Sequence, residues 1–190
     1  MTWPSNVERI GDSFDDVLVA AQTGADWAVA VLYGSLQPRL LRFLRARAGQ
    51  DAEDIASQAW LEIARGLPGF SGGEDEFSAF VFTVARRRLA DQRRAARRRP
   101  VDPAGHETLA GLPGAEAPED EAIAHLRGED AARRIAELLP AEQAEIVLLR
   151  VVGGFSVDEV ARVVGRRPGT VRVLQHRALR RLAAQLGDDL

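Results

Sequence analysis

Arginine side chains dominate one short stretch of this 190-residue sequence: residues 81–99 contain eight arginines and a single acid, Asp91. Guanidinium groups at this density can contact several phosphates at once, which makes nucleic-acid binding strongly salt-dependent. A basic helix end would explain a few of these arginines but not eight. Nearby aromatic residues offer faces on which unstacked bases could lie, although we expect most of them in the core. They are Trp60, Phe70, Phe77, Phe80 and Phe82.

A second stretch, residues 156–186, has the sequence features of a helix-turn-helix. Ser156 and Glu159 have the spacing of a capping box at the start of a short helix, and Gly165 marks the turn after it. A longer helix is expected from about Pro168 to Leu186. Together with the helix expected for residues 142–152, these two helices have the spacing of a three-helix DNA-binding unit whose last helix enters the major groove.

The last helix of that unit is predicted to have one apolar and one basic face. Steps of about 100° per residue separate an inner set, Val171, Leu174, Ala178 and Leu182, from an outer set, Arg172, Val173, His176 and Arg180. Outward arginines can reach guanine edges or phosphates, and an outward valine can contact a thymine methyl group. The alternative is an amphipathic helix whose outer face contacts only solvent. The cap, the turn glycine and the basic face together favour DNA binding.

A third group of polar residues lies on the helix predicted for residues 51–65. It consists of Asp51, Glu53, Asp54, Gln58 and Glu62. Carboxylates can act as acids and bases, but the sequence offers no nucleophile or phosphate-binding glycine loop beside them. Because the chain has no cysteine and only three scattered histidines, we expect no metal site, no cofactor and no enzymatic activity. A solvated surface is the default interpretation of these residues.

The elements that must position these groups are all predicted to be helices. Apolar residues recur at helical spacing on both sides of a segment rich in proline, glycine and acids. Within the first half, Pro38 is expected to bend the helix of residues 27–48 or to split it. The predicted fold is therefore all-α, with two small helical domains joined by a flexible acidic linker. The predicted boundaries are 1–25 for an N-terminal segment, 26–99 and 130–190 for the domains, and 100–129 for the linker.

Charge and hydropathy constrain the location. The net charge is −3 because acidic segments flank the arginine stretch. Neither a signal peptide nor a run of about 20 apolar residues is present, so we expect a cytoplasmic protein.

Four ordered motifs of this sequence resemble the extracytoplasmic-function sigma factors of bacterial RNA polymerase, which belong to the sigma-70 family. They lie in residues 32–94 and are, in order, LYGSLQPRLLRFLRAR, DAEDIASQAWLEI, GLPGFSGG and FSAFVFTVARRRLADQRR, which resemble the first conserved domain of that family. The segment LPAEQAEIVLLRVVGGFSVDEVARVVGRRPGTVRVLQHRALRRL resembles the second conserved domain of that family, region 4. The resemblance covers residues of about 27–99 and 130–186. It implies a subunit that binds core RNA polymerase and directs initiation at specific promoters.

The resemblance also implies a role for each group of residues. Residues implied to dock on the polymerase are Asp51, Asp54, Ile55, Gln58 and Glu62. Residues implied to open and hold the minus-10 promoter element are Phe70, Phe77, Arg86, Arg87, Arg88, Asp91, Arg93 and Arg94. Residues implied to read the minus-35 element are Arg166, Arg167, Thr170, Arg172, Val173, His176 and Arg177. An anti-sigma factor, often anchored in the membrane, is the implied inhibitor.

Some positions depart from the usual family pattern and leave the promoter sequence undetermined. They are Ala59, Arg88, Pro168 and Val173.

Two other functions remain as alternatives on sequence alone. An autonomous helix-turn-helix regulator would bind a symmetric operator as a dimer, without polymerase. An arginine-rich RNA-binding module is the other alternative.

Overall fold

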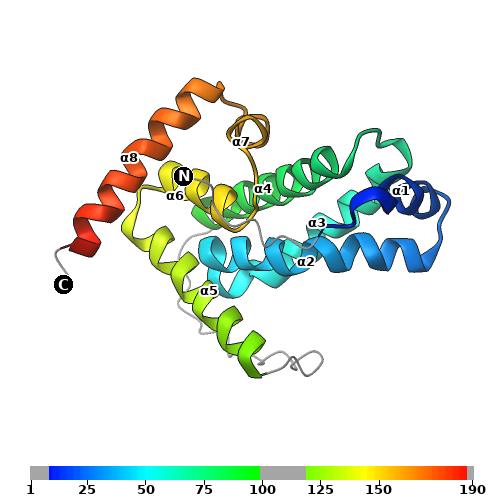
Figure 1. Ribbon diagram of the computed structural model, residues 1–190, viewed down its shortest axis with the longest axis horizontal. Coiled ribbons are helices and arrows are strands. Elements are labelled where there is room, and N and C mark those ends of the chain that lie inside the picture. Colours follow the sequence, from blue (N-terminus) through cyan, green and yellow to red (C-terminus); the bar gives the residue numbers. More distant parts are fainter. Residues whose placement is uncertain (1–8, 99–118, 188–190) are drawn as a thin grey trace.

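The computed structural model describes residues 9–98 and 119–187, and every element within those residues is helical. Figure 1 shows the helices in chain order. Short 3-10 turns lie at Gly11–Ser13, Gly49–Asp51 and Leu67–Gly69. The α-helices are α1 (Phe14–Gln22), α2 (Asp26–Ala48), α3 (Ala52–Gly66), α4 (Glu74–Arg98), α5 (Glu119–Leu138), α6 (Ala141–Val151), α7 (Val157–Val164) and α8 (Pro168–Gly187). The prediction of an all-α fold is confirmed.

Helices α2, α3 and α4 form the first helical unit, and each buries the apolar stripe that its sequence predicts. Helix α3 buries Ile55, Ala59 and Ile63, and α4 buries Phe77, Val81 and Val84. Helix α2 is one continuous helix, so of the two expected effects of Pro38, a bend or a split, the split does not occur. A proline inside a helix costs about 3 kcal/mol, but apolar residues buried on both sides of Pro38 offset that cost. These residues are Ala28, Leu32, Leu36, Leu40, Phe43 and Leu44.

Helix α1 was not predicted, yet it is part of the first unit. It buries Phe14, Val17, Leu18 and Ala21. The side-chain amide of Gln22 donates to the carbonyl oxygens of Leu67 (3.0 Å) and Phe70 (2.7 Å). Helix α1 therefore holds the loop that follows α3 and carries Phe70.

Helices α5 to α8 form the second unit. Ser156 and Glu159 make the predicted capping box at the start of α7. Gly165 ends α7 with φ of 66°, a left-handed conformation that glycine adopts without strain. Helix α5 begins at Glu119, so the last part of the predicted linker, residues 119–129, is helical. The preceding linker residues, 99–118, lie outside the described residues.

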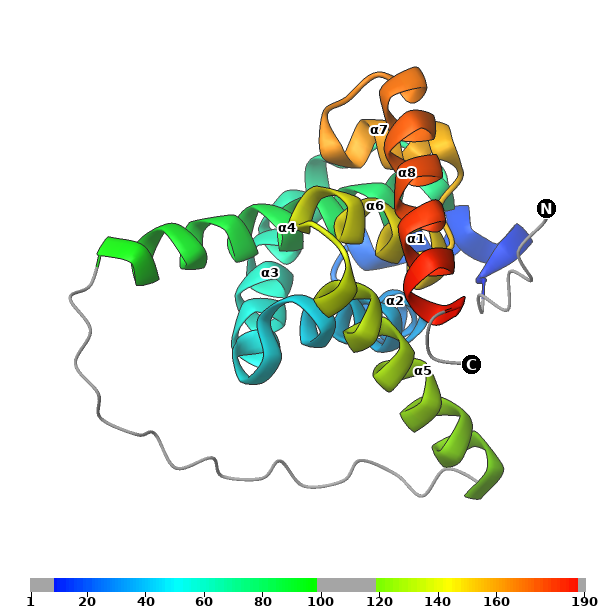
Figure 2. The same ribbon diagram turned by 90° about the vertical axis from the view of Figure 1, so that its left-hand side faces the viewer.

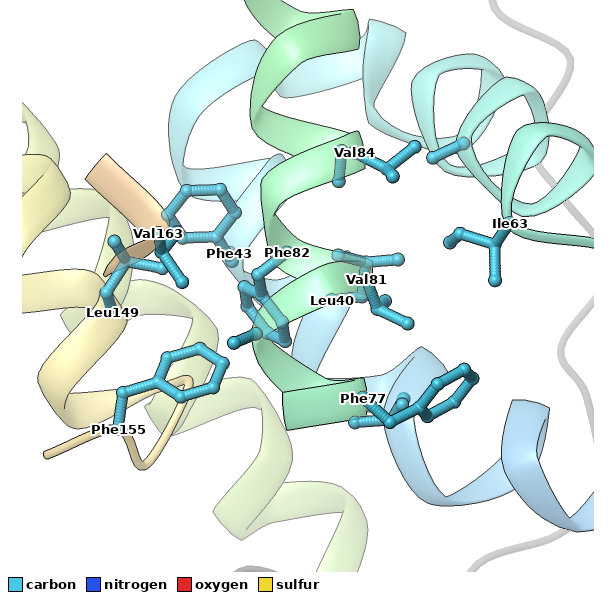
Figure 3. Close-up of a cluster of buried hydrophobic side chains, with 14 of the residues drawn as sticks. Leu40, Phe43, Ile63, Phe77, Val81, Phe82, Val84, Leu149, Phe155 and Val163 are labelled. Atoms are coloured by element: carbon cyan, nitrogen blue, oxygen red, sulfur yellow. The ribbon is translucent and has the colours of Figure 1, made fainter. Parts of the chain in front are cut away.

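The two units pack against each other through one continuous apolar core. A single cluster of buried side chains runs from Phe14 in α1 to Val171 in α8. Figure 3 shows Leu149, Phe155 and Val163 of the second unit approaching Phe82 and Phe43 of the first. The rings of Phe82 and Phe155 meet edge to face, with centroids 4.9 Å apart. Helix α7 packs against α4, above which it lies in Figure 2.

Candidate nucleic-acid interface

Helix α8 presents the predicted basic face to solvent. Its inner residues Val171 and Ala178 are fully buried, whereas half of the Val173 surface is exposed. All seven residues predicted for the minus-35 element are exposed: Arg166, Arg167, Thr170, Arg172, Val173, His176 and Arg177. Helix α8 lies at the edge of the molecule, far from α1 (Figure 1). A duplex could approach this face without moving another helix.

Ion pairs within the second unit leave this face available. Arg166 lies 2.9 Å from Glu142, and Arg172 lies 3.9 Å from Asp158. Both arginine side chains remain more than half exposed. Pairs of this kind contribute little, so phosphates could replace the carboxylates at small cost.

The arginines of α4 are less free, because acidic groups or carbonyls from other elements contact them. Glu62 of α3 pairs with both Arg87 and Arg88. Arg86 donates to Glu145 of α6 (3.0 Å), and Arg93 donates to the carbonyl oxygen of Arg47 (2.7 Å). The predicted minus-10 residue Asp91 pairs with Arg94 on the same helix.

Phe70 and Phe77, both predicted to meet the minus-10 element, lie in different environments. Phe70 is half-buried in the loop before α4. Phe77 is 1% exposed, so its ring is covered in this arrangement, and its contact with a base stays a prediction. The Phe77 ring packs edge-on against the Phe70 ring, with 5.3 Å between their centroids, and thereby supports it.

The polar face predicted on α3 is present with one exception. Asp51, Asp54 and Gln58 are exposed, and Glu62 is half-buried where it meets Arg87 and Arg88. Ile55 is 1% exposed and belongs to the core, and its contact with the polymerase stays a prediction. Its spacing from Ala59 and Ile63 is that of the buried stripe.

An apolar groove of about 670 Å³ runs between α2 and α3. Tyr33 and Trp60 lie on its wall with their rings 5.0 Å apart, and the Trp60 indole donates to Gln37 (2.6 Å). Leu61, 60% exposed, lies at the groove beside Ser57. The groove therefore extends the exposed face of α3 with apolar surface.

Sequence reasoning missed the residues that join the two units. Glu145 of α6 is 8% exposed, and Arg47 and Arg86 of the first unit pair with it. Only the position of Glu145 among the apolar residues of α6 could have indicated its burial. The spacing of neighbouring residues in the sequence cannot identify its partners, Arg47 and Arg86.

Two further observations concern only the part of the chain that the structure describes. None of its helices is both long and apolar enough to cross a membrane. No three or more histidine and acidic side chains there gather in a way that could hold a metal ion.

Comparison with known families assigns each unit. Residues 32–99 match the model of sigma-70 region 2, and residues 129–182 match that of sigma-70 region 4. The chain is 35% identical to the ECF RNA polymerase sigma factor SigD of Mycobacterium tuberculosis over 182 residues, which are 93% of this chain and 85% of SigD. It is also 35% identical to the ECF sigma factor ShbA of Streptomyces griseus over 168 residues, 80% of this chain and 84% of ShbA.

Two solved structures share the fold. CnrH, in complex with the cytosolic domain of CnrY, superposes with a TM-score of 0.65 at 18% identity, covering 94% of this chain and all of CnrH. RpoE of Bartonella quintana, in complex with the anti-sigma factor NepR, gives 0.63 at 23% identity, covering 85% of this chain and 98% of RpoE. The two family matches and the identity to SigD and ShbA show that this chain belongs to the extracytoplasmic-function sigma factors, the sigma-70-family subunits that direct bacterial RNA polymerase to specific promoters.

Proposed function

We propose that this sigma factor performs its three binding tasks with three surfaces, one each on α3, α4 and α8. The observation that carries the assignment is the division of α8 into a buried face, with Val171 and Ala178, and an exposed face, with Arg172 and Val173. The exposed face reads the minus-35 element in the major groove. Arg172 is placed to contact a guanine or a phosphate, and Val173 a thymine methyl group.

The minus-10 surface consists of the loop that carries Phe70 and the arginines of α4. Phe70 is the aromatic residue that meets an unstacked base, and Phe77 and Phe80 support it. Binding energy from the arginines opens the duplex, so promoter melting needs no catalytic group. The contributing residues are Arg86, Arg87, Arg88, Asp91, Arg93 and Arg94.

The polymerase-docking surface is the exposed face of α3. Asp51, Asp54, Gln58 and Glu62 provide its polar part, and Leu61 beside the groove provides exposed apolar surface. An interface that combines charged groups with an apolar patch gains both orientation and affinity. The protein acts by binding rather than by turnover, in the cytoplasm where polymerase and promoter DNA meet.

An anti-sigma factor is the proposed inhibitor. RpoE of Bartonella quintana was solved with the anti-sigma factor NepR, and this chain shares its fold. An inhibitor of the present chain would cover the docking face of α3 and thereby prevent holoenzyme formation.

The first experiment combines the purified chain with bacterial core RNA polymerase and a library of genomic promoters. We expect co-elution with core polymerase in gel filtration and transcripts from a subset of promoters that share minus-35 and minus-10 elements. A regulator acting alone would instead protect duplex DNA without polymerase, with two symmetric half-sites about one helical turn apart. Footprinting of that kind, together with failure to bind core polymerase, contradicts the proposal.

A further inference from the structure

The side chain of Glu145 connects the two helical units at a buried position. One of its carboxylate oxygens, Oε1, accepts a hydrogen bond from Arg86 Nε at 3.0 Å and lies 3.7 Å from an Nη atom of Arg47. The Glu145 side chain is 10% exposed and that of Arg47 is 7% exposed. Both arginines belong to the first unit, and Glu145 belongs to the second. A single carboxylate therefore compensates two cationic groups across the contact.

Two arginines of α2 are desolvated by the same contact. Arg47 donates to the carbonyl oxygen of Ala141 (3.0 Å), and Arg39 donates to that of Gly153 (2.9 Å). Burial lowers the pKa of Arg47, which the charge of Glu145 partly counteracts. Burial also lowers the pKa of Arg39. Both guanidinium groups thus lose hydration when the units close, and acceptors on the second unit replace the water.

The packed arrangement of the two units, the closed state, therefore depends on Glu145. In the open state the two units are apart. With Glu145 present, its carboxylate compensates the positive charge of Arg47 in the closed state, and water hydrates Arg47 in the open state. Without it, Arg47 remains buried and uncompensated only while the units are closed, because opening returns it to water. Loss of the negative charge therefore penalises the closed state specifically, and the population shifts toward the open state.

The closed state cannot perform the proposed function at two promoter elements simultaneously. Elements centred about 25 base pairs apart are separated by about 85 Å at about 3.4 Å per base pair. A compact chain of this length has a radius of gyration of about 16 Å. In addition, Arg86 of the proposed minus-10 surface is already paired with Glu145. Promoter binding therefore requires the units to separate.

We propose that Glu145 is an intramolecular latch that holds the free sigma factor closed through Arg47 and Arg86. The inference rests on the proposed function for its biological meaning, but the latch itself is a property of the free protein. Opening releases Arg86 for DNA and allows the α8 face to move away from α4.

The latch can be tested by energy transfer between two dyes, one on each unit. The natural chain has no cysteine, so Val19→Cys on α1 and Ala183→Cys on α8 introduce the only thiols. Both positions are exposed and lie outside the proposed binding surfaces. Single-molecule measurements on the free, full-length chain then give the fractions of closed and open molecules.

Glu145→Gln should raise the open fraction by at least about tenfold, because it removes the charge and keeps the shape. Glu142→Gln is the matched control. It is the same substitution on the same helix, and Glu142 pairs with Arg166 inside the second unit, so it should leave the fractions unchanged. Arg86→Gln removes a partner of Glu145 from the other side and should also raise the open fraction. It serves as the second variant if circular dichroism shows that Glu145→Gln does not fold.

The latch is overturned if the native chain lacks a dominant closed population, or if Glu142→Gln opens the protein as much as Glu145→Gln does. It is likewise overturned if neither Glu145→Gln nor Arg86→Gln changes the fractions. These measurements contain no polymerase and no DNA. Failure of the latch is therefore distinguishable from failure of the proposed function, which appears only when core polymerase is added.

Discussion

In this sigma factor, buried side chains pack the core, whereas exposed side chains are available for recognition. Phe77 and Ile55 lie in stretches whose exposed residues are proposed to bind partners, yet both are buried in the core. Val173 is the converse case, an apolar side chain left half exposed among arginines. An exposed valine side chain leaves apolar surface in contact with water. Contact with a thymine methyl group in the DNA major groove would remove that surface from water.

Arg172→Ala should weaken recognition of the minus-35 element by about 1 to 3 kcal/mol if Arg172 binds a guanine bidentately. The measurement is the promoter profile of holoenzyme that contains the variant. We expect selectivity to be relaxed at one base position of the minus-35 element. Arg133→Ala, on α5, removes an exposed arginine that pairs with Asp130 one turn away, and should leave the profile unchanged. An unaltered profile for Arg172→Ala would exclude a guanine contact.

Asp54→Lys should lower affinity for core polymerase by roughly tenfold, equivalent to about 1.4 kcal/mol, because it reverses a charge on the docking face of α3. Asp54 is exposed, so the variant should keep its thermal stability. Titration of labelled core polymerase gives the affinity. Asp15→Lys reverses an exposed acid on α1 and should bind normally. Equal affinity of both variants would remove Asp54 from the docking surface.

At the scale of elements, the connection between α6 and α7 sets the position of the helix-turn-helix. Gly153 lies where the chain turns out of α6, and its carbonyl oxygen accepts from Arg39 of α2. A Cβ atom at Gly153 would lie 2.6 Å from the carbonyl oxygen of Leu149 and 2.6 Å from the ring of Phe155. Only glycine fits, since both neighbours are held by the core.

Gly153→Ala should destabilise the protein by about 1 to 3 kcal/mol, the usual cost of overpacking a fixed site. Urea denaturation followed by circular dichroism gives the change. Gly169→Ala is the control, because a Cβ atom there meets nothing within 4 Å and alanine favours the helical state of α8. It should be neutral or slightly stabilising. The steric argument fails if both variants have the same stability.

At the scale of the whole molecule, the shared core should make the two units unfold together. Phe155 contributes an edge-to-face contact with Phe82 and lies between the units (Figure 3). All three tryptophans, Trp3, Trp27 and Trp60, lie in the first 60 residues, so fluorescence reports on the first half alone. Circular dichroism reports on all helices. Coincident transitions by the two probes indicate a single cooperative unit.

Phe155→Ala should separate those transitions. The truncation removes a buried ring, which costs about 3 to 5 kcal/mol, and the loss falls on the second unit and on its contact with α4. We expect the helical signal to fall in part before the tryptophan signal changes, whereas the native chain should show one transition. Non-coincident transitions in the native chain would contradict a shared core.

The sequence by itself determined the helices, their buried faces and the order of the two units. Helical periodicity in α3, α4 and α8 is a local property, since neighbours three and four residues apart share a face whatever the tertiary context. The capping box at Ser156 and the glycine turn at Gly165 are local for the same reason. The candidate surfaces on α3 and α8 followed from that periodicity.

Only the tertiary structure decided how the two units meet. Glu145 finds Arg86 across 59 residues of chain, and Arg39 finds Gly153 across 114. Such pairs depend on the packing of whole helices, and no spacing rule connects residues so far apart. The same limit explains α1, whose short apolar stripe becomes a helix because the core of α2 and α4 buries it. Local chemistry therefore specified the proposed binding surfaces, whereas long-range packing specified which of their arginines are already paired in the free protein.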